Sequence, residues 1–171
     1  MRRSWNRRWP LGLALLAVVV LGLTGCVGGA AQATSWTGLT VIEDTIYAAD
    51  VERVVALDAA EGEPLWSFPR DPKEDNRGLF YATPTVVGDM IIVASEMPAR
   101  GFFSAPRHVV WGLDPQGRDL WSFDDASGQY VEGGAAADGV FVIGNSDGSI
   151  YALDVNTGDL KWKFKTGHRV W

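Results

Sequence analysis

A phrase of about a dozen residues occurs three times in this chain, and it constrains the fold more than any other feature. An Asp, a Gly and a Trp mark each copy, with a Leu before the Asp and an aromatic residue two positions after the Trp. The copies consist of Asp58, Gly62 and Trp66; of Asp114, Gly117 and Trp121; and of Asp154, Gly158 and Trp162. Such self-similarity predicts a repeated supersecondary unit.

Each copy is typical of two strands joined by a tight turn, because alternating or β-branched segments flank a turn rich in Asp and Gly. Four short strands can be assigned to each unit. They cover 36–41, 45–49, 53–57 and 64–68 in the first; 81–87, 90–95, 107–113 and 119–123 in the second; and 131–137, 140–144, 149–153 and 160–165 in the third. We therefore predict an all-β fold, a β-propeller of four-stranded antiparallel blades.

The phrase resembles the pyrroloquinoline-quinone-like (PQQ-like) β-propeller repeat, whose pattern is A-x-D-x-x-T-G-x-x-x-W. The third copy matches every fixed position, with Ala152, Asp154, Thr157, Gly158 and Trp162. The first copy has Glu61 in place of the Thr, and the second has Gly112 in place of the Ala and a turn one residue shorter. The resemblance covers about 36–171 and implies that each Trp docks against the turn of a neighbouring blade.

The number of blades predicts an incomplete propeller. Propellers close with about four to eight blades, whereas this chain supplies three (about 36–68, 81–123 and 131–165) and the start of a fourth at 169–171. We expect an N-terminal fragment of a longer protein, with an apolar face uncovered on the first blade and on the third.

The first 25 residues are typical of a secretory signal. Four arginines near the start precede an apolar run at 11–24, which is too short to span a bilayer comfortably. The run ends in L-T-G-C, which resembles a bacterial lipobox with Cys26 as the lipidated residue. We predict a signal peptide at 1–25, lipidated Cys26 with a flexible tether at 26–35, and the propeller from 36. An ordinary signal peptide whose Cys falls there by chance is the alternative, and the export route, Sec or twin-arginine, stays open.

Charge argues against nucleic acid as a partner. The net charge is -6, and without the four N-terminal arginines the remaining 11 basic and 21 acidic residues give -10. Phosphate backbones repel such a surface. Cys26 is the only cysteine, so no intrachain disulfide can form.

The longest predicted loops, 69–80, 96–106 and 124–130, share one face of the blades, opposite the repeat turns. Loops on a rigid scaffold commonly carry function. Phe102 and Phe103 form the candidate partner surface, together with His168 on the same face. The alternative is that both rings fold back over a blade junction and complete the core.

The sequence predicts no catalytic or metal-binding residue. His108 and His168 lack partners at ligand spacing, and Asp147 suits a hairpin turn better than a calcium site, which needs six or more oxygen ligands. The resemblance links PQQ to an adjacent-cysteine disulfide in many quinoprotein dehydrogenases, and that disulfide is impossible here. We therefore expect neither PQQ nor calcium.

Two functions remain open. The first is a non-enzymatic, lipid-anchored scaffold that binds envelope proteins, similar to the BamB family of propeller lipoproteins of outer-membrane assembly. The second is the N-terminal part of a PQQ-dependent dehydrogenase or of a ligand-sensing propeller. We favour the scaffold, exported and anchored to a membrane of the bacterial cell envelope.

Overall fold

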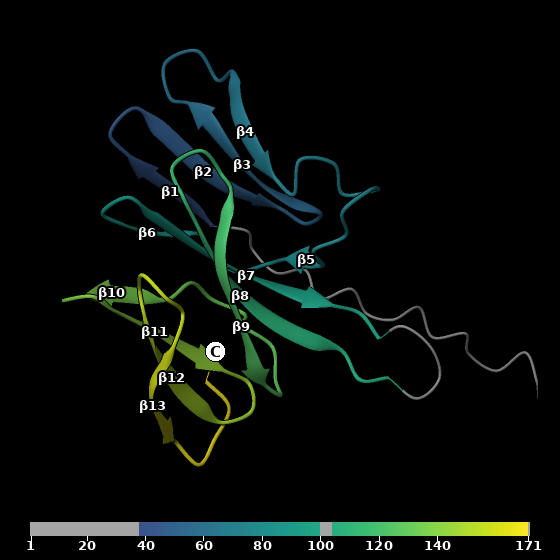
Figure 1. Cartoon of the computed structure of the whole chain (residues 1–171), viewed down its shortest axis with the longest axis vertical. Coiled ribbons are helices and arrows are strands. Elements are labelled where there is room, and N and C mark those ends of the chain that lie inside the picture. Colours follow the sequence, from purple (N-terminus) through teal and green to yellow (C-terminus); the bar gives the residue numbers. More distant parts are fainter. Residues whose placement is uncertain (1–37, 100–103, 171) are drawn as a thin grey trace, which may run out of the picture. The chain divides into compact units, whose positions relative to one another are not determined.

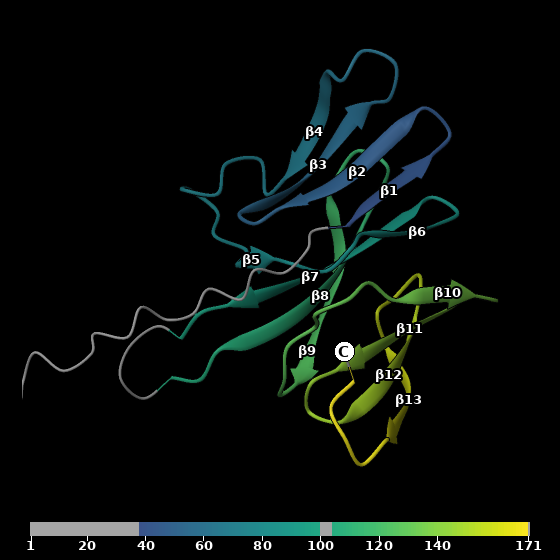
Figure 2. The same ribbon diagram turned by 180° about the vertical axis from the view of Figure 1, so that it is seen from behind.

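The computed structural model describes residues 38–99 and 104–170, and this part of the chain contains strands and no helix (Figures 1 and 2). The first sheet is β1 (Leu39–Ile42), β2 (Thr45–Asp50), β3 (Arg53–Asp58) and β4 (Pro64–Phe68). The second is β5 (Leu79–Phe80), β6 (Thr85–Val87), β7 (Met90–Met97), β8 (Arg107–Leu113) and β9 (Asp119–Ala126). The third is β10 (Ala135–Ala137), β11 (Val140–Asn145), β12 (Ser149–Asp154) and β13 (Leu160–Lys165).

All three sheets are antiparallel, and apart from the pair β5 and β7 the neighbours in sheet order are also neighbours in sequence. In the second sheet β5 and β6 both pair with β7, so they are two pieces of one inner strand. We call the sheets blades 1, 2 and 3. Their strand orders confirm the predicted all-β fold of four-stranded antiparallel blades.

In each repeat turn, the Asp side chain accepts hydrogen bonds from backbone N–H groups of the turn and so stabilises it. Asp58 Oδ1 accepts hydrogen bonds from the backbone N–H groups of Ala60 and Glu61, at 2.9 and 2.8 Å. Asp114 and Asp154 accept equivalent bonds in blades 2 and 3. The three turn glycines have left-handed backbones, with φ of 72°, 75° and 74° at Gly62, Gly117 and Gly158. A residue with a Cβ is strained in that conformation.

Each of the first two repeat tryptophans docks on the turn of the following blade. The Trp66 indole N–H donates to the Pro115 carbonyl oxygen at 2.9 Å, and the Trp121 indole N–H donates to the Val155 carbonyl oxygen at 3.0 Å. The rings lie over Gly117 and Gly158, where a Cβ would come within 2.5 and 2.4 Å of the ring atoms. Gly117 and Gly158 are therefore required for two reasons: the turn needs a left-handed backbone, and the indole ring leaves no room for a Cβ.

Two apolar clusters hold the blades together, one on each face of blade 2. The cluster towards blade 1 contains Phe68, Phe80 and Trp111, with Phe68 and Trp111 in an edge-on contact at 5.6 Å between centroids. The cluster towards blade 3 contains Phe123, Phe141 and Tyr151. Alternate residues of β7 serve the two clusters, Ile91 the first and Ile92 the second, as expected for a strand with both faces buried.

The structure differs from the sequence prediction at the inner strands. The segment 81–87 is interrupted at 81–84, where Pro84 cannot donate a ladder hydrogen bond, and pairing resumes at Thr85. The predicted strand at 131–137 begins only at Ala135. Gly133 and Gly134 precede it, close against Thr83 and Phe141.

The structure shows the predicted docking for Trp66 and Trp121, and the docking of Trp162 stays a prediction. Trp162 is 48% exposed, and no described residue accepts a hydrogen bond from its indole N–H. The reason is that no further blade lies beside β13 among the described residues. Trp171 lies outside them, although the Val170 backbone N–H donates to the Asn145 carbonyl oxygen at 3.3 Å.

Apolar side chains remain exposed on the outer faces of blades 1 and 3, as the blade count predicts. Leu39 and Val41 are 67% and 58% exposed on blade 1, and Phe164 is 61% exposed on blade 3. No helix long and apolar enough to cross a membrane occurs in residues 38–99 and 104–170.

Candidate functional site

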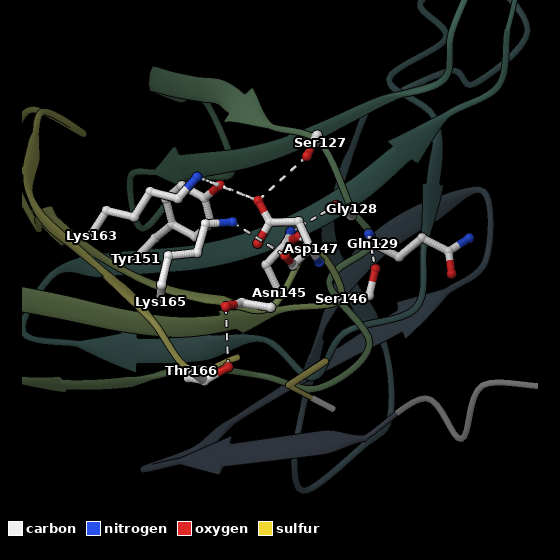
Figure 3. Close-up of polar contacts among 11 residues, drawn as sticks. Ser127, Gly128, Gln129, Asn145, Ser146, Asp147, Tyr151, Lys163, Lys165 and Thr166 are labelled. Carbon is white, nitrogen blue, oxygen red and sulfur yellow. Dashed lines mark hydrogen bonds and ion pairs between the residues drawn. The ribbon is translucent and has the colours of Figure 1, made fainter. Parts of the chain in front are cut away.

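Three segments of blade 3 meet at the end of the blade opposite the repeat turns. They are the β9–β10 link (127–134), the β11–β12 turn (146–148) and the segment after β13 (166–170). The side chains of Ser127, Tyr151 and Lys163 point towards Asp147, and Thr166 bonds the neighbouring Gly148 carbonyl oxygen, as Figure 3 shows. We call this group the Asp147 network.

The Asp147 carboxylate is held by two partners from neighbouring strands. The Tyr151 hydroxyl donates to Oδ2 at 2.5 Å, and the Lys163 ammonium lies 3.4 Å from the same oxygen. Lys163 also donates to the Tyr151 hydroxyl oxygen at 2.5 Å and lies 4.3 Å from the centre of the Tyr151 ring. Tyr151 and Lys163 face each other because they are paired across β12 and β13.

The three groups shift one another's pKa. Burial alone would raise the pKa of Asp147, but the hydrogen bond from Tyr151 and the charge of Lys163 lower it below its usual range. Burial, followed by the hydrogen bond to Asp147, raises the pKa of Tyr151. The hydrogen bond to Tyr151 raises the pKa of Lys163. At neutral pH the phenol therefore stays protonated between a carboxylate and an ammonium, and the trio forms a structural bridge.

Further hydrogen bonds fix the backbone of the three segments. The Asn145 side-chain amide donates to the Gly128 carbonyl oxygen at 2.7 Å, and the Asn145 side-chain oxygen accepts from the Asp147 backbone N–H at 2.9 Å. The Ser146 hydroxyl accepts from the Gln129 backbone N–H at 2.7 Å. Thr166 donates both its backbone N–H and its hydroxyl to the Gly148 carbonyl oxygen, at 3.0 and 3.1 Å. Cross-bracing of this kind holds the loops in a defined shape.

Blade 2 repeats the arrangement with other residues. Ser95 stands in β7 where Asn145 stands in β11, and its hydroxyl donates to the Arg77 carbonyl oxygen at 2.6 Å and accepts from the Trp111 indole N–H at 2.9 Å. Gln129 joins the two blades, since its side-chain amide donates to Glu96 at 2.7 Å. Both blades thus present braced loops on the same side.

A concavity of 490 Å³ opens beside the Asp147 network. Its lining consists of Ser146, Asp147, Gly148, Lys165, Gly167, His168 and Arg169. His168 and Lys165 are exposed, and the Lys165 ammonium lies 3.4 Å from the Asp147 backbone carbonyl oxygen. Lys165 and Arg169 together outweigh the single carboxylate of Asp147 in this lining, so the rim is positively charged although the chain as a whole is acidic. A larger concavity, of 680 Å³, lies along β4 beside the docked Trp66.

Of the three residues of the predicted partner surface, the structure describes only His168. The structure places His168 on the rim of the concavity. Phe102 and Phe103 lie outside the described residues, as does Cys26. His108 is a buried β8 residue with 3% exposure, and burial lowers its pKa.

The sequence predicts Asp147 as a turn residue and does not single out Tyr151 or Lys163. The sequence nevertheless contains the information that pairs them, because Tyr151 and Lys163 stand at same-face positions of two strands joined by a repeat turn. Register alone would place them side by side.

The described residues do not fit a metal ion. They contain no group of three His, Cys, Asp or Glu side chains placed to hold one. Asp147 on the loop side faces the ammonium of Lys163, which would repel a cation. Calcium in particular needs six or more oxygen ligands, and a single carboxylate that is already paired does not supply them.

Comparison with known proteins identifies the family. The model of the PQQ_2 family, described as outer membrane protein assembly factor BamB, matches residues 6–169. The chain belongs to this family. Among curated proteins it is 27% identical over 112 residues to the "Putative dehydrogenase XoxF" of Paracoccus denitrificans, a match that covers 60% of this chain and 17% of that protein.

Solved structures of two kinds share the fold. BamB from Moraxella catarrhalis matches with a TM-score of 0.56 and 23% identity over 75% of this chain and 35% of its own. Quinohemoprotein alcohol dehydrogenase ADHIIG from Pseudomonas putida HK5 matches with a TM-score of 0.59 and 17% identity over 75% and 26%. The chain thus spans about a third or less of these relatives, and identities this low show the fold alone.

Proposed function

We propose that this protein is a non-enzymatic propeller scaffold of the bacterial cell envelope, anchored to the membrane through lipidated Cys26, that binds other envelope proteins. The observation that carries the proposal is the braced, positively charged concavity beside the Asp147 network. A surface that is fixed before binding loses little conformational entropy on association. The match to a family described as an outer membrane protein assembly factor supports the same function.

The chemistry of the concavity suggests an acidic partner segment. Lys165 and His168 are exposed on its rim, whereas the Asp147 carboxylate is engaged inside the blade by Tyr151 and Lys163. Complementary charge directs encounter and orientation more than it adds affinity. The scaffold needs neither PQQ nor calcium for this binding.

The test is site-specific photo-crosslinking in cells that contain the full-length protein. A photo-reactive residue in place of His168 is expected to yield a discrete crosslinked envelope protein, and Lys165→Glu is expected to reduce its yield at least several-fold. Lys73→Glu is the matched control, because Lys73 is an exposed lysine in the β4–β5 link, outside the concavity. Equal crosslinking in both variants would contradict the assignment of the surface.

The predicted aromatic surface needs its own variants. The double substitution of Phe102 and Phe103 by Ala is expected to weaken partner capture and to leave thermal unfolding nearly unchanged. A large loss of stability would instead favour rings folded over a blade junction.

A specific observation favours a second candidate, the N-terminal part of a PQQ-dependent dehydrogenase. This observation is the similarity of the chain to the "Putative dehydrogenase XoxF" and to quinohemoprotein alcohol dehydrogenase ADHIIG. Titration of the purified protein with PQQ in the presence of Ca²⁺, followed by fluorescence and by dye-linked alcohol oxidation, separates the two functions. Saturable PQQ binding would favour the dehydrogenase.

A further inference from the structure

A buried histidine lies at the loop end of blade 2, beside a carboxylate. His108 is the second residue of β8, and its Nδ1 atom is buried without a hydrogen-bond partner among the described residues. Glu96 of β7 is paired with it in register, so the two side chains leave the sheet on the same face as close neighbours. Burial outweighs the charge of Glu96 and lowers the pKa of His108, so the imidazole is neutral at pH 7.

Glu96 also begins a series of hydrogen bonds that reaches the concavity. Its carboxylate accepts a hydrogen bond from the Gln129 side-chain amide at 2.7 Å. The Gln129 backbone N–H donates to the Ser146 hydroxyl oxygen at 2.7 Å, and the Ser146 backbone N–H donates to the Gln129 carbonyl oxygen at 3.0 Å. Ser146 is part of the lining of the concavity. Blade 2 therefore contacts this edge of the concavity through the Glu96 carboxylate.

The other titratable groups of the elements around this contact do not compete for it. β9 places Ala126 in register with His108, so Glu96 is the charged residue that the described neighbouring strands pair with the imidazole. The remaining groups are paired with each other, phenolic or exposed to water: Arg107 with Asp124, Lys163 with Asp147, Tyr81, Tyr130, Asp125 and Glu132. Burial raises the pKa of both phenols, so they stay neutral between about pH 5 and 8.

We propose that His108 is a pH-sensitive switch for the concavity. Protonation turns the imidazole into a cation beside Glu96, and the carboxylate then turns from Gln129 to His108, because a charged donor is a stronger partner than a neutral amide. The edge of the concavity at Ser146 thereby loses its contact with blade 2. The consequence for partner binding rests on the proposed function, whereas the switch itself is a property of the chain without a partner.

The direction of the switch follows from the shift at His108. Its pKa in the folded protein lies below the ordinary value of 6.5, so the stability that depends on a neutral imidazole is fully present above that pH and is lost as the pH falls below it. The contact between Glu96 and Gln129 therefore predominates at about pH 7.5, and the opened form gains population towards about pH 5.5.

Hydrogen exchange of the full-length protein in detergent tests the switch without a partner. After correction for intrinsic exchange, we expect the Gln129 and Ser146 amides to exchange about 5-fold or more faster at about pH 5.5 than at about pH 7.5. His108→Gln is expected to abolish this difference. His168→Gln is the matched control, because His168 is the only other histidine of the chain, and it is expected to retain the difference. A difference that persists in His108→Gln, or that disappears in His168→Gln, would overturn the proposal.

A second variant, Glu96→Gln, tests the same contact and decides the question if His108→Gln does not fold. The amide of the new side chain can still bond Gln129, but it has no charge to attract a protonated His108. Exchange of the Gln129 and Ser146 amides is therefore expected to become nearly independent of pH. A pH-dependent rate equal to that of the unmodified protein, in a folded Glu96→Gln variant, would contradict the role of Glu96.

Photo-crosslinking in isolated membranes separates the switch from the proposed function. With the photo-reactive residue in place of His168, the yield is expected to fall several-fold from about pH 7.5 to about pH 5.5, and His108→Gln is expected to keep it constant. Equal yields together with pH-dependent exchange would contradict the regulation of the concavity. The absence of a crosslink at both pH values would contradict the proposed function, and the exchange rates would still decide the switch.

Discussion

Replacement of Trp121 by Ala tests the assignment of the tryptophan-to-turn contact as the link between blades. The ring packs on Gly158 and its N–H donates to the Val155 carbonyl oxygen at 3.0 Å. A covered indole buries about 150–250 Å², and Trp121 is partly covered, so at about 25 cal/mol per Å² its loss removes about 3.5 kcal/mol. The lost hydrogen bond adds about 1 kcal/mol, whereas a compact unfolded state reduces the area contribution. We expect a net loss of about 3 kcal/mol, in line with large-to-small changes in protein cores.

Urea unfolding followed by far-UV circular dichroism measures this loss. For a chain of this size, about 3 kcal/mol lowers Tm by roughly 6–12 °C. Trp162→Ala is the matched control, since the same residue type at the same repeat position is exposed. Its expected cost in this chain is under about 1 kcal/mol. Equal losses for Trp121 and Trp162, or a loss under about 0.5 kcal/mol for Trp121, would refute the docking assignment.

Three further predictions concern single residues. Gly158→Ala is expected to cost more than Gly62→Ala in thermal unfolding. Both strain a left-handed backbone by about 1–2 kcal/mol, but only Gly158 would also press a Cβ against a docked ring; equal costs would contradict this. Asp147→Asn is expected to reduce stability at pH 7 and to have less effect below about pH 4, because a depressed carboxyl pKa contributes stability that is lost as the pH falls; a pH-independent difference in unfolding free energy would count against the ion-pair assignment. Cys26→Ser is expected to move the protein from the membrane fraction to the soluble fraction, as judged by immunoblot, and unaltered partition would indicate an uncleaved anchor.

The sequence predicts the outer three strands of each blade well because local signals set them. The repeat turn between Asp154 and Gly158 supplies both an Asp side chain that caps the turn and a glycine that tolerates positive φ, and these signals depend on neighbours in the sequence alone. The inner strands are less predictable. The interruption at 81–84 and the late start at Ala135 depend on how the segments pack against neighbouring blades, which strand propensity does not contain.

Less of the candidate site can be predicted. Strand direction alone assigns His168 to the loop side, and the structure places it on the rim of the concavity. The Asp147 network escapes prediction because Asp147, Tyr151 and Lys163 carry no recognisable motif. Their contact arises from the pairing of β12 with β13 and from burial, both of which are tertiary properties. The exposure of Trp162 cannot be read from the repeat, which is the same for a docked and an undocked ring.

The contact between Trp66 and the turn after β8 runs in one direction only, from each blade to the next. Blade 2 therefore receives the ring of blade 1 on one side and gives its own ring to blade 3 on the other. A gene segment that encodes one whole blade can be duplicated or lost without the invention of a new type of interface, since the flanking blades already carry the matching halves. Such modular joints allow family members to differ in length while they keep one rule of assembly.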